Sequence, residues 1–162
     1  MVTYHEVQRF RDTAICWVVL AVHLQALALV GLLLLGDGAN LVRTAIVGVV
    51  LALPVVPLST ASLVTEVDTD GGVVRIRVAP FPWTRTVALA DFTAVERIED
   101  FPALGASLGV ESALSGRKNT TYCLATAGGV RIRLRDSREI RLGSRRPAEL
   151  FGTLDSVGVS GR

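Results

Sequence analysis

Two long uncharged stretches dominate the first third of the chain. Residues Thr13–Gly36 and Thr44–Thr65 contain no Asp, Glu, Lys or Arg. Each stretch is longer than the roughly 20 apolar residues that a helix needs to cross a bilayer. The eight residues between them, Gly36–Arg43, include the turn formers Gly, Asp and Asn. This pattern predicts a transmembrane helical hairpin over residues 13–64, with helices at 13–36 and 44–64.

The charges around these stretches predict an orientation. Arg9 and Arg11 precede the first stretch, and fourteen of the seventeen Lys and Arg residues follow the second. Because positive charge is retained on the cytoplasmic side, we expect a multi-pass protein of the cell membrane with both termini in the cytoplasm. A cleaved signal peptide is the alternative for the first stretch, but its apolar run is longer than a usual signal core and lacks a small-residue cleavage site.

Polar residues before and inside the first stretch suggest further roles. Residues 1–12 mix aromatic, apolar and basic side chains, which predicts a juxtamembrane interfacial segment with Tyr4 and Phe10 near the headgroups. His23 and Gln25 lie inside the stretch, where a contact with the other helix or with a second copy of the chain is the simplest role. A proton or ion path is the alternative, although the stretch offers these two residues no charged partner.

From about residue 65 onward, the pattern changes to the two-residue period of β-strands. Seven short runs, separated by turn signals, read as strands: Val64–Asp68, Val73–Val78, Arg85–Leu89, Thr93–Ile98, Thr121–Thr126, Val130–Arg135 and Glu139–Leu142. The segment Pro147–Val157 has apolar residues at helical spacing, with Ser144 as a candidate cap upstream. We therefore predict a seven-stranded antiparallel barrel or sandwich with a C-terminal helix over residues 65–157, followed by a tail at 158–162.

Three segments carry a family resemblance: EVQRF at Glu6–Phe10, VAPFPWTRTVALADFTAVE at Val78–Glu96, and GGVRIRLRDSREIRLGSRRPAEL at Gly128–Leu150. They resemble uncharacterised prokaryotic membrane proteins in which two transmembrane helices precede a bacterial pleckstrin-homology-like (PH-like) domain. The resemblance implies an α+β membrane protein with that order of parts. Residues 100–119 depart from the glycine- and tryptophan-rich loop of that group, and the acidic loop at Asp68–Gly72 differs from basic lipid-binding loops. Neither loop function is therefore carried over.

Arginines are concentrated near the C-terminus, with seven among the eighteen residues Val130–Pro147. In VRIRLR they alternate with apolar residues, which predicts the solvated face of a half-buried strand; headgroup or protein contact is the alternative. If Arg75 and Arg77 share that sheet, interleaved acids such as Glu96, Glu99 or Glu139 are expected to offset repulsion. Free amides at the start of the last helix also favour an anion. The candidate anion or headgroup contacts are Arg117, Lys118, Arg131, Arg133, Arg135, Arg145 and Arg146.

The residue inventory argues against catalysis. The two histidines, His5 and His23, precede the predicted β domain, and Cys16 and Cys123 form neither a metal-binding nor a disulfide pattern. No nucleotide-binding glycine motif is present, and a net charge of +2 does not indicate nucleic acid. We therefore expect no catalytic, metal or cofactor site.

These observations predict a non-enzymatic interaction or scaffold module at the cytoplasmic membrane face. Its expected partners are membrane lipids and either another protein or a second copy of the chain, and not nucleic acid. Two alternatives stay open. One is a sensor of anionic lipid headgroups that uses the arginines, and the other is a subunit of a transporter or channel assembled around His23 and Gln25.

Overall fold

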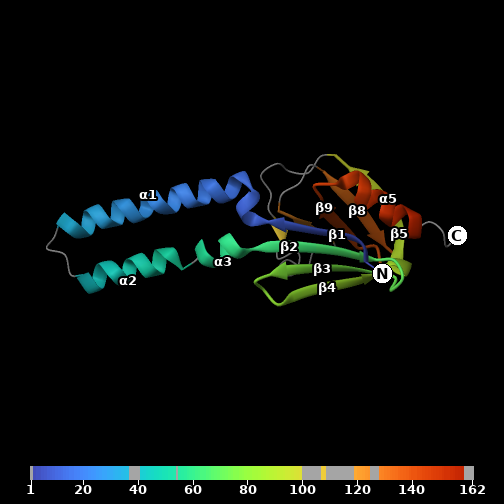
Figure 1. The fold of residues 1–162 in the computed structure, drawn as a ribbon, viewed down its shortest axis with the longest axis horizontal. Coiled ribbons are helices and arrows are strands. Elements are labelled where there is room, and N and C mark those ends of the chain that lie inside the picture. Colours follow the sequence, from blue (N-terminus) through green and yellow to red (C-terminus); the bar gives the residue numbers. More distant parts are fainter. Residues whose placement is uncertain are drawn as a thin grey trace. The chain divides into compact units, whose positions relative to one another are not determined.

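The computed structural model describes residues 2–36, 41–53, 55–99, 107–108, 119–124 and 128–158. The chain divides into two compact units (Figure 1). Residues Met1–Arg9 and Ser62–Arg162 form the first, which we call the β domain, and Phe10–Ala61 form the second, the helical unit. The α+β class predicted from the sequence is confirmed, because two sheets and a C-terminal helix are present.

The helical unit contains η1 (Phe10–Asp12), α1 (Ala14–Gly36), α2 (Leu41–Ala52) and α3 (Val55–Thr60). At 1.5 Å per residue, α1 is about 35 Å long, and among the described residues its stretch Ala14–Leu32 alone is long and apolar enough to cross a membrane. The second helix predicted at 44–64, with a kink at Pro54 and Pro57, is therefore wrong as a single membrane-spanning helix, because this range holds parts of α2, α3 and the start of β2. Pro54 stands between α2 and α3, where a ring without an N–H interrupts a helix, and residues from Ser62 onward belong to a strand.

The first sheet of the β domain has the strand order β1-β2-β3-β4, with every neighbouring pair antiparallel. The strands are β1 (Val2–Arg9), β2 (Ser62–Asp68), β3 (Val73–Ala79) and β4 (Trp83–Ala88). Residues 2–9 thus form an edge strand paired with β2, which differs from the interfacial segment predicted for residues 1–12. Tyr4 is buried within the β domain rather than exposed for headgroup contact.

The second sheet has the order β5-β8-β9-β7-β6 and contains one parallel pair, β7 with β9. Its elements are β5 (Phe92–Ile98), β6 (Ser107–Leu108), β7 (Asn119–Cys123), β8 (Gly129–Leu134) and β9 (Glu139–Gly143), preceded by η2 (Leu89–Asp91). All seven predicted strands are present, within a few residues of their expected bounds. The single seven-stranded antiparallel barrel is wrong, because β5 pairs with β8 and starts a separate sheet.

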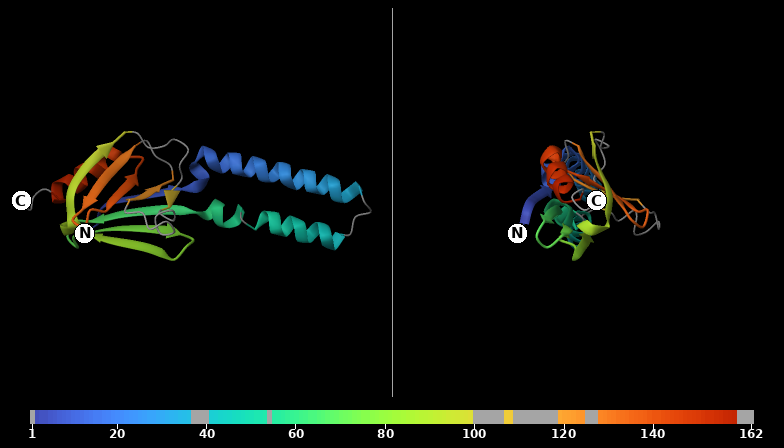
Figure 2. Two further views of the ribbon diagram at one scale, coloured as in Figure 1. Left: turned by 180° about the vertical axis from the view of Figure 1, so that it is seen from behind. Right: turned by 90° about the vertical axis from the view of Figure 1, so that its right-hand side faces the viewer.

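The core of the β domain is formed by the inward-facing side chains of the two sheets and of helix α5 (Pro147–Gly158). α5 contacts β5 and β8 (Figure 2). Leu150 and Leu154 stand one turn apart on one face of α5, and both are fully buried. Full burial of such side chains contributes about 1.5–3 kcal/mol each. The inward apolar rows of the central strands are Val74, Ile76, Val78, Val130, Ile132, Leu134, Ile140 and Leu142.

Candidate functional site

The inward face of β1 is polar, unlike the inward faces of its neighbours. Tyr4, Glu6 and Gln8 alternate along the strand, and their side chains are only 1%, 6% and 1% exposed. Alternate residues of a strand point to the same face, so these three form one buried polar row. Buried polar groups are costly unless they are hydrogen-bonded, and this row therefore needs partners from the rest of the β domain.

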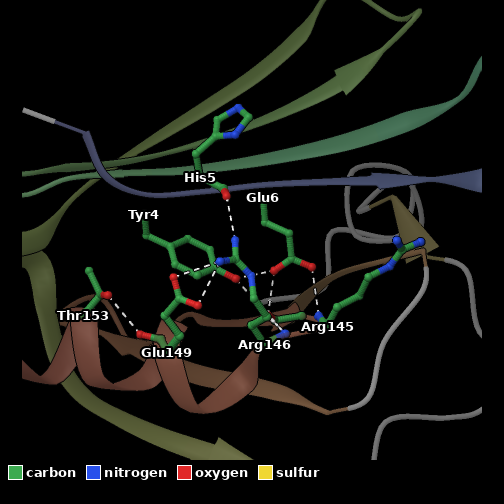
Figure 3. Close-up of polar contacts among 8 residues, drawn as sticks. Tyr4, His5, Glu6, Arg145, Arg146, Glu149 and Thr153 are labelled. Atoms are coloured by element: carbon green, nitrogen blue, oxygen red, sulfur yellow. Dashed lines mark hydrogen bonds and ion pairs between the residues drawn. The ribbon is translucent and has the colours of Figure 1, made fainter.

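The carboxylate of Glu6 receives hydrogen bonds from four groups, and Figure 3 shows its surroundings. One of them is Gln8 Nε2, which donates to Oε1 over 3.3 Å. The hydroxyls of Tyr4 and Ser144 both donate to Oε2, the latter over 2.7 Å, and the backbone N–H of Arg145 donates to Oε1 over 2.8 Å. The oxygens of Tyr4 and Ser144 lie 2.9 Å apart. We call Tyr4, Glu6, Ser144 and the backbone of Arg145 the Glu6 cluster. It joins the first strand to the segment that leads into α5.

The predicted anion site before the last helix is thus filled by the chain itself. Ser144 Oγ accepts the backbone N–H of Arg146, the residue before α5, over 2.8 Å, so Ser144 stabilises the turn that leads into the helix, while its capping of α5 stays a prediction. The Glu6 carboxylate lies beside this turn, where the free amides and the helix dipole stabilise negative charge. The physical expectation of an anion at this place was therefore sound, but the anion is a carboxylate from β1.

Arg146 covers the Glu6 cluster from outside. Its guanidinium donates to both carboxylate oxygens of Glu149, over 3.0 and 2.9 Å, and to the carbonyl oxygen of His5 over 2.9 Å. The same group lies 5.2 Å from the centre of the Tyr4 ring, within cation–π range. The guanidinium expected to hold an external phosphate is therefore engaged with three groups of the β domain.

Gln8 extends the connection to the second sheet. Its Nε2 donates to the carbonyl oxygen of Gly143 over 2.7 Å, and its Oε1 accepts the backbone N–H of Leu124 over 3.0 Å. Both backbone groups belong to segments that are far from β1 in the sequence. Together with the Glu6 cluster, Gln8 fixes β1 to the end of β9 and to the residue that follows β7.

Tyr4 is the titratable group most strongly affected by this environment. Burial, and then the hydrogen bond to Glu6, raise the pKa of its hydroxyl far above the ordinary value of about 10. A phenol that ionises in the unfolded chain but stays neutral in the folded domain contributes stability that is complete below pH 10. This stability is lost as the pH rises toward the folded pKa.

We therefore expect the β domain to lose stability in alkali through Tyr4. The free energy of unfolding should fall by up to about 1.4 kcal/mol per pH unit above pH 10 because of this group, and Tyr4→Phe should remove that part of the slope. Urea unfolding of the full chain in detergent micelles at a series of alkaline pH values measures it. Tyr122→Phe is the matched control, since it keeps Tyr4. An unchanged slope in Tyr4→Phe would contradict the assignment.

The outer face of the second sheet carries alternating charges, which we call the charged strip: Glu96, Arg131, Arg133, Glu139 and Arg141. Glu96 lies 3.4 Å from Arg131 and 3.1 Å from Arg133, and Glu139 lies 3.3 Å from Arg131 and 2.6 Å from Arg141. Glu96 and Glu139 thus lie between the arginines of the second sheet, although the shared sheet with Arg75 and Arg77, for which such acids were expected, is not formed. Surface ion pairs of this kind contribute at most about 1 kcal/mol each, so the strip adds little to stability.

The other predicted basic contacts do not join this strip. Arg75 and Arg77 lie on β3 of the first sheet, so the arginine surface expected to combine β3 and β8 is not formed. Glu99 pairs with Arg97, at 3.7 Å. Arg117 and Lys118 lie outside the described residues, as does most of the segment 100–119.

Arg135 lines a cavity of about 240 Å³ beside β4, η2 and the turn after β8. Arg85 and Arg138 line it too, together with Asp91 and Asp136. The charge of the cavity is partly neutralised, because Arg138 Nε lies 2.5 Å from Asp136 Oδ2. Arg85 donates to the hydroxyls of Thr120 and Tyr122 over 3.1 and 3.2 Å, so it connects β4 to β7.

The positions of the polar residues of α1 do not depend on a partner from another helix. His23 Nδ1 donates to the carbonyl oxygen of Val19 one turn earlier, over 2.8 Å, and Gln25 is exposed. Contact of either residue with a second copy stays a prediction. Cys16 and Cys123 are buried, and neither forms a disulfide.

Within the described parts of the chain, no group of three or more His, Cys, Asp or Glu side chains is arranged to hold a metal ion. Comparison with family models, curated proteins and solved structures finds no match for the chain. The resemblance to PH-like membrane proteins therefore stays a prediction, and any function rests on the geometry described above.

The residues of the Glu6 cluster were not identified as a unit from the sequence. Tyr4 was assigned to a membrane interface and Arg145 to an external anion, and Glu6 entered only as part of a family motif. A usable signal was the three-residue set of alternating polar side chains in β1, since a strand with such a row needs a polar partner elsewhere. The sequence contains no information on where that partner lies.

Proposed function

We propose that the protein is a membrane-anchored, non-enzymatic interaction module, whose β domain is held at one face of the membrane. The observation that supports this most directly is the position of the helical unit in the chain. Residues 10–61 are inserted between β1 and β2, which are neighbouring antiparallel strands with Arg9 opposite Ser62. No linker separates the helices from the sheet, because η1 follows β1 directly and only Ala61 stands between α3 and β2.

This insertion favours two membrane passes. A chain that leaves the sheet at Arg9 and re-enters it opposite, at Ser62, must return to the side on which it started. The backbone N–H of Phe10 donates to the carbonyl oxygen of Ala61 over 2.9 Å and closes the base of the insertion. We infer that α1 crosses the membrane outward and that α2 and α3 together make the return pass as a helix interrupted at Pro54. By the positive-inside rule, the β domain and both termini lie in the cytoplasm.

The charged strip favours a protein as the partner, rather than an anionic membrane surface. Three arginines and two glutamates alternate there, and each glutamate lies within 4 Å of two arginines. Such mixed charge offers little net attraction to anionic headgroups but gives a protein surface the complementary pattern that sets specificity. The partner is a second protein or a second copy of this chain with matching charges.

The two-pass arrangement predicts opposite accessibility of two introduced cysteines. In sealed inverted membrane vesicles, Asp70→Cys in the turn after β2 should react with a membrane-impermeant maleimide, whereas Gly38→Cys between α1 and α2 should not. Right-side-out vesicles should reverse this result. The unmodified chain is the control, because Cys16 and Cys123 are buried. Labelling of both positions from the same side would contradict the proposed crossings.

A photo-crosslinking amino acid at Arg133 tests the partner class. This side chain belongs to the charged strip and is half exposed. In intact cells, we expect adducts of protein size at this position and not at the exposed control position Asp155 on α5. Adducts of lipid size at Arg133 would instead support the headgroup-sensor alternative.

A further inference from the structure

We propose that the β3–β4 hairpin tip, residues Pro80–Trp83, inserts its aromatic side chains into the membrane interface and fixes the orientation of the β domain. The proposal rests on the proposed function, since it requires the helical unit to be in a bilayer. The occupant of the tip is the acyl and headgroup boundary of that same bilayer. Neither the charged strip nor the Glu6 cluster takes part in this contact.

The tip is apolar, aromatic and exposed. Phe81 and Trp83 are 45% and 47% exposed, and their ring centres lie 5.9 Å apart. Among the described residues of the β domain, no other aromatic side chain is among its exposed large hydrophobic groups. A tryptophan beside a phenylalanine is the kind of pair that membrane interfaces accommodate, because the amphipathic indole prefers the headgroup level.

Strand register places the tip at the end of the sheet that adjoins the helical unit in sequence. Ala79, the last residue of β3, is opposite Ser62, the first residue of β2, and Arg9 at the end of β1 is opposite Ser62 on the other side. Adjacent strands lie about 4.8 Å apart. The tip therefore begins one strand from Ser62, where the chain leaves the helices, and two strands from Arg9, where the chain enters them. In the proposed anchoring, the tip thus starts beside the points where the chain passes into the bilayer.

The charged residues of the first sheet also differ between its helix-proximal end and its opposite end. Arg9 and Arg77 are exposed near the helix-proximal end, whereas the turn at the opposite end carries Asp68 and Asp70. Gly71 donates its backbone N–H to Asp68, which lowers the pKa of that carboxyl and keeps it ionised. Arg75 offsets part of the negative charge near Asp68, and the remaining difference between the two ends has the sign that an anionic membrane surface favours.

Single-tryptophan variants test the proposal, since the chain contains only Trp17 and Trp83. Trp17→Phe leaves Trp83 at the tip, and Trp83→Phe leaves Trp17 in α1. A distal control combines both replacements with Asp70→Trp, about 20 Å away along the ladder. The full-length variants are reconstituted in phosphatidylcholine vesicles with and without brominated acyl chains, which quench tryptophans that contact them. Circular dichroism confirms that each variant retains its β structure.

We expect Trp83 to lose emission in brominated vesicles to an extent comparable with Trp17, and the distal tryptophan to lose none. Quenching of Trp17 without quenching of Trp83 would overturn the tip insertion while leaving the membrane anchor intact. Absence of quenching at Trp17 would overturn the anchor itself. Equal quenching at the tip and at the distal turn would also overturn the insertion of the aromatic tip.

Discussion

A fragment that begins at Ser62 is expected to remain unfolded, whereas a chain in which Asn-Gly replaces residues 11–60 is expected to fold as a soluble β domain. The fragment lacks β1 and with it Tyr4, Glu6 and Gln8. Loss of this strand leaves the amides of Leu124 and Arg145 without the acceptors described above. It also removes the apolar contacts of the strand, and the combined cost approaches the 5–15 kcal/mol by which domains are stable.

The shortened chain keeps β1 and joins it to β2 through a two-residue turn in place of the helical unit. Phe10 and Ala61 are already joined by a backbone hydrogen bond of 2.9 Å, which is the geometry that flanks a two-residue hairpin turn, and Asn-Gly is the preferred sequence for such a turn. Amide dispersion in NMR spectra and a cooperative urea transition distinguish the two chains. Cooperative folding of the fragment that begins at Ser62 would show that β1 is dispensable.

Glu6→Ala is expected to lower the free energy of unfolding by about 3–5 kcal/mol. The substitution leaves donors on Tyr4, Ser144 and Arg145 without this acceptor, and it also removes the longer hydrogen bond from Gln8 Nε2. Glu6→Gln keeps the shape and one carbonyl oxygen, so we expect a smaller loss of about 1–2 kcal/mol. Urea denaturation followed by circular dichroism, on the full chain in micelles, gives both values.

Two controls separate this effect from general sensitivity. Glu149→Ala removes an exposed carboxylate paired with Arg146 and should cost less than about 1 kcal/mol. Thr65→Val changes a buried residue directly opposite Glu6. The Oγ1 atom of Thr65 has no hydrogen-bond partner within the described residues. The substitution should leave stability equal or raise it, because a buried hydroxyl without a partner is unfavourable. A loss in Glu6→Ala no larger than that in Glu149→Ala would refute the role of the cluster.

Local patterns sufficed for the elements that have one apolar and one polar face. Val130–Arg135 is such a case, since Val130, Ile132 and Leu134 point inward and the arginines outward, as the alternation predicts. The helix that begins at Pro147 is also present as predicted, and Ser144 lies in the turn that leads into it. The same reasoning did not predict β1, because the inward-facing residues of this strand are polar. Its buried and exposed faces therefore do not differ in hydrophobicity.

Which distant segments pair with each other could not be predicted from the sequence. Whether β5 continues the first sheet or starts another depends on its contact with β8, about 35 residues later, and nothing in either strand specifies that choice. The predicted second helix failed for a related reason. The absence of charge from Thr44 to Thr65 is shared by a helical part and by the start of β2, and composition alone does not mark the boundary between them.

The insertion of residues 10–61 between two paired strands also constrains the order of events during synthesis. β1 leaves the ribosome first, but its partner β2 and the residues that bind Glu6 are translated only after both apolar segments. Until then, Tyr4, Glu6 and Gln8 lack the neighbours that bury them. In the proposed membrane arrangement, delivery of the helical unit to the bilayer precedes closure of the β domain, and β1 is translated well before it gains its native contacts.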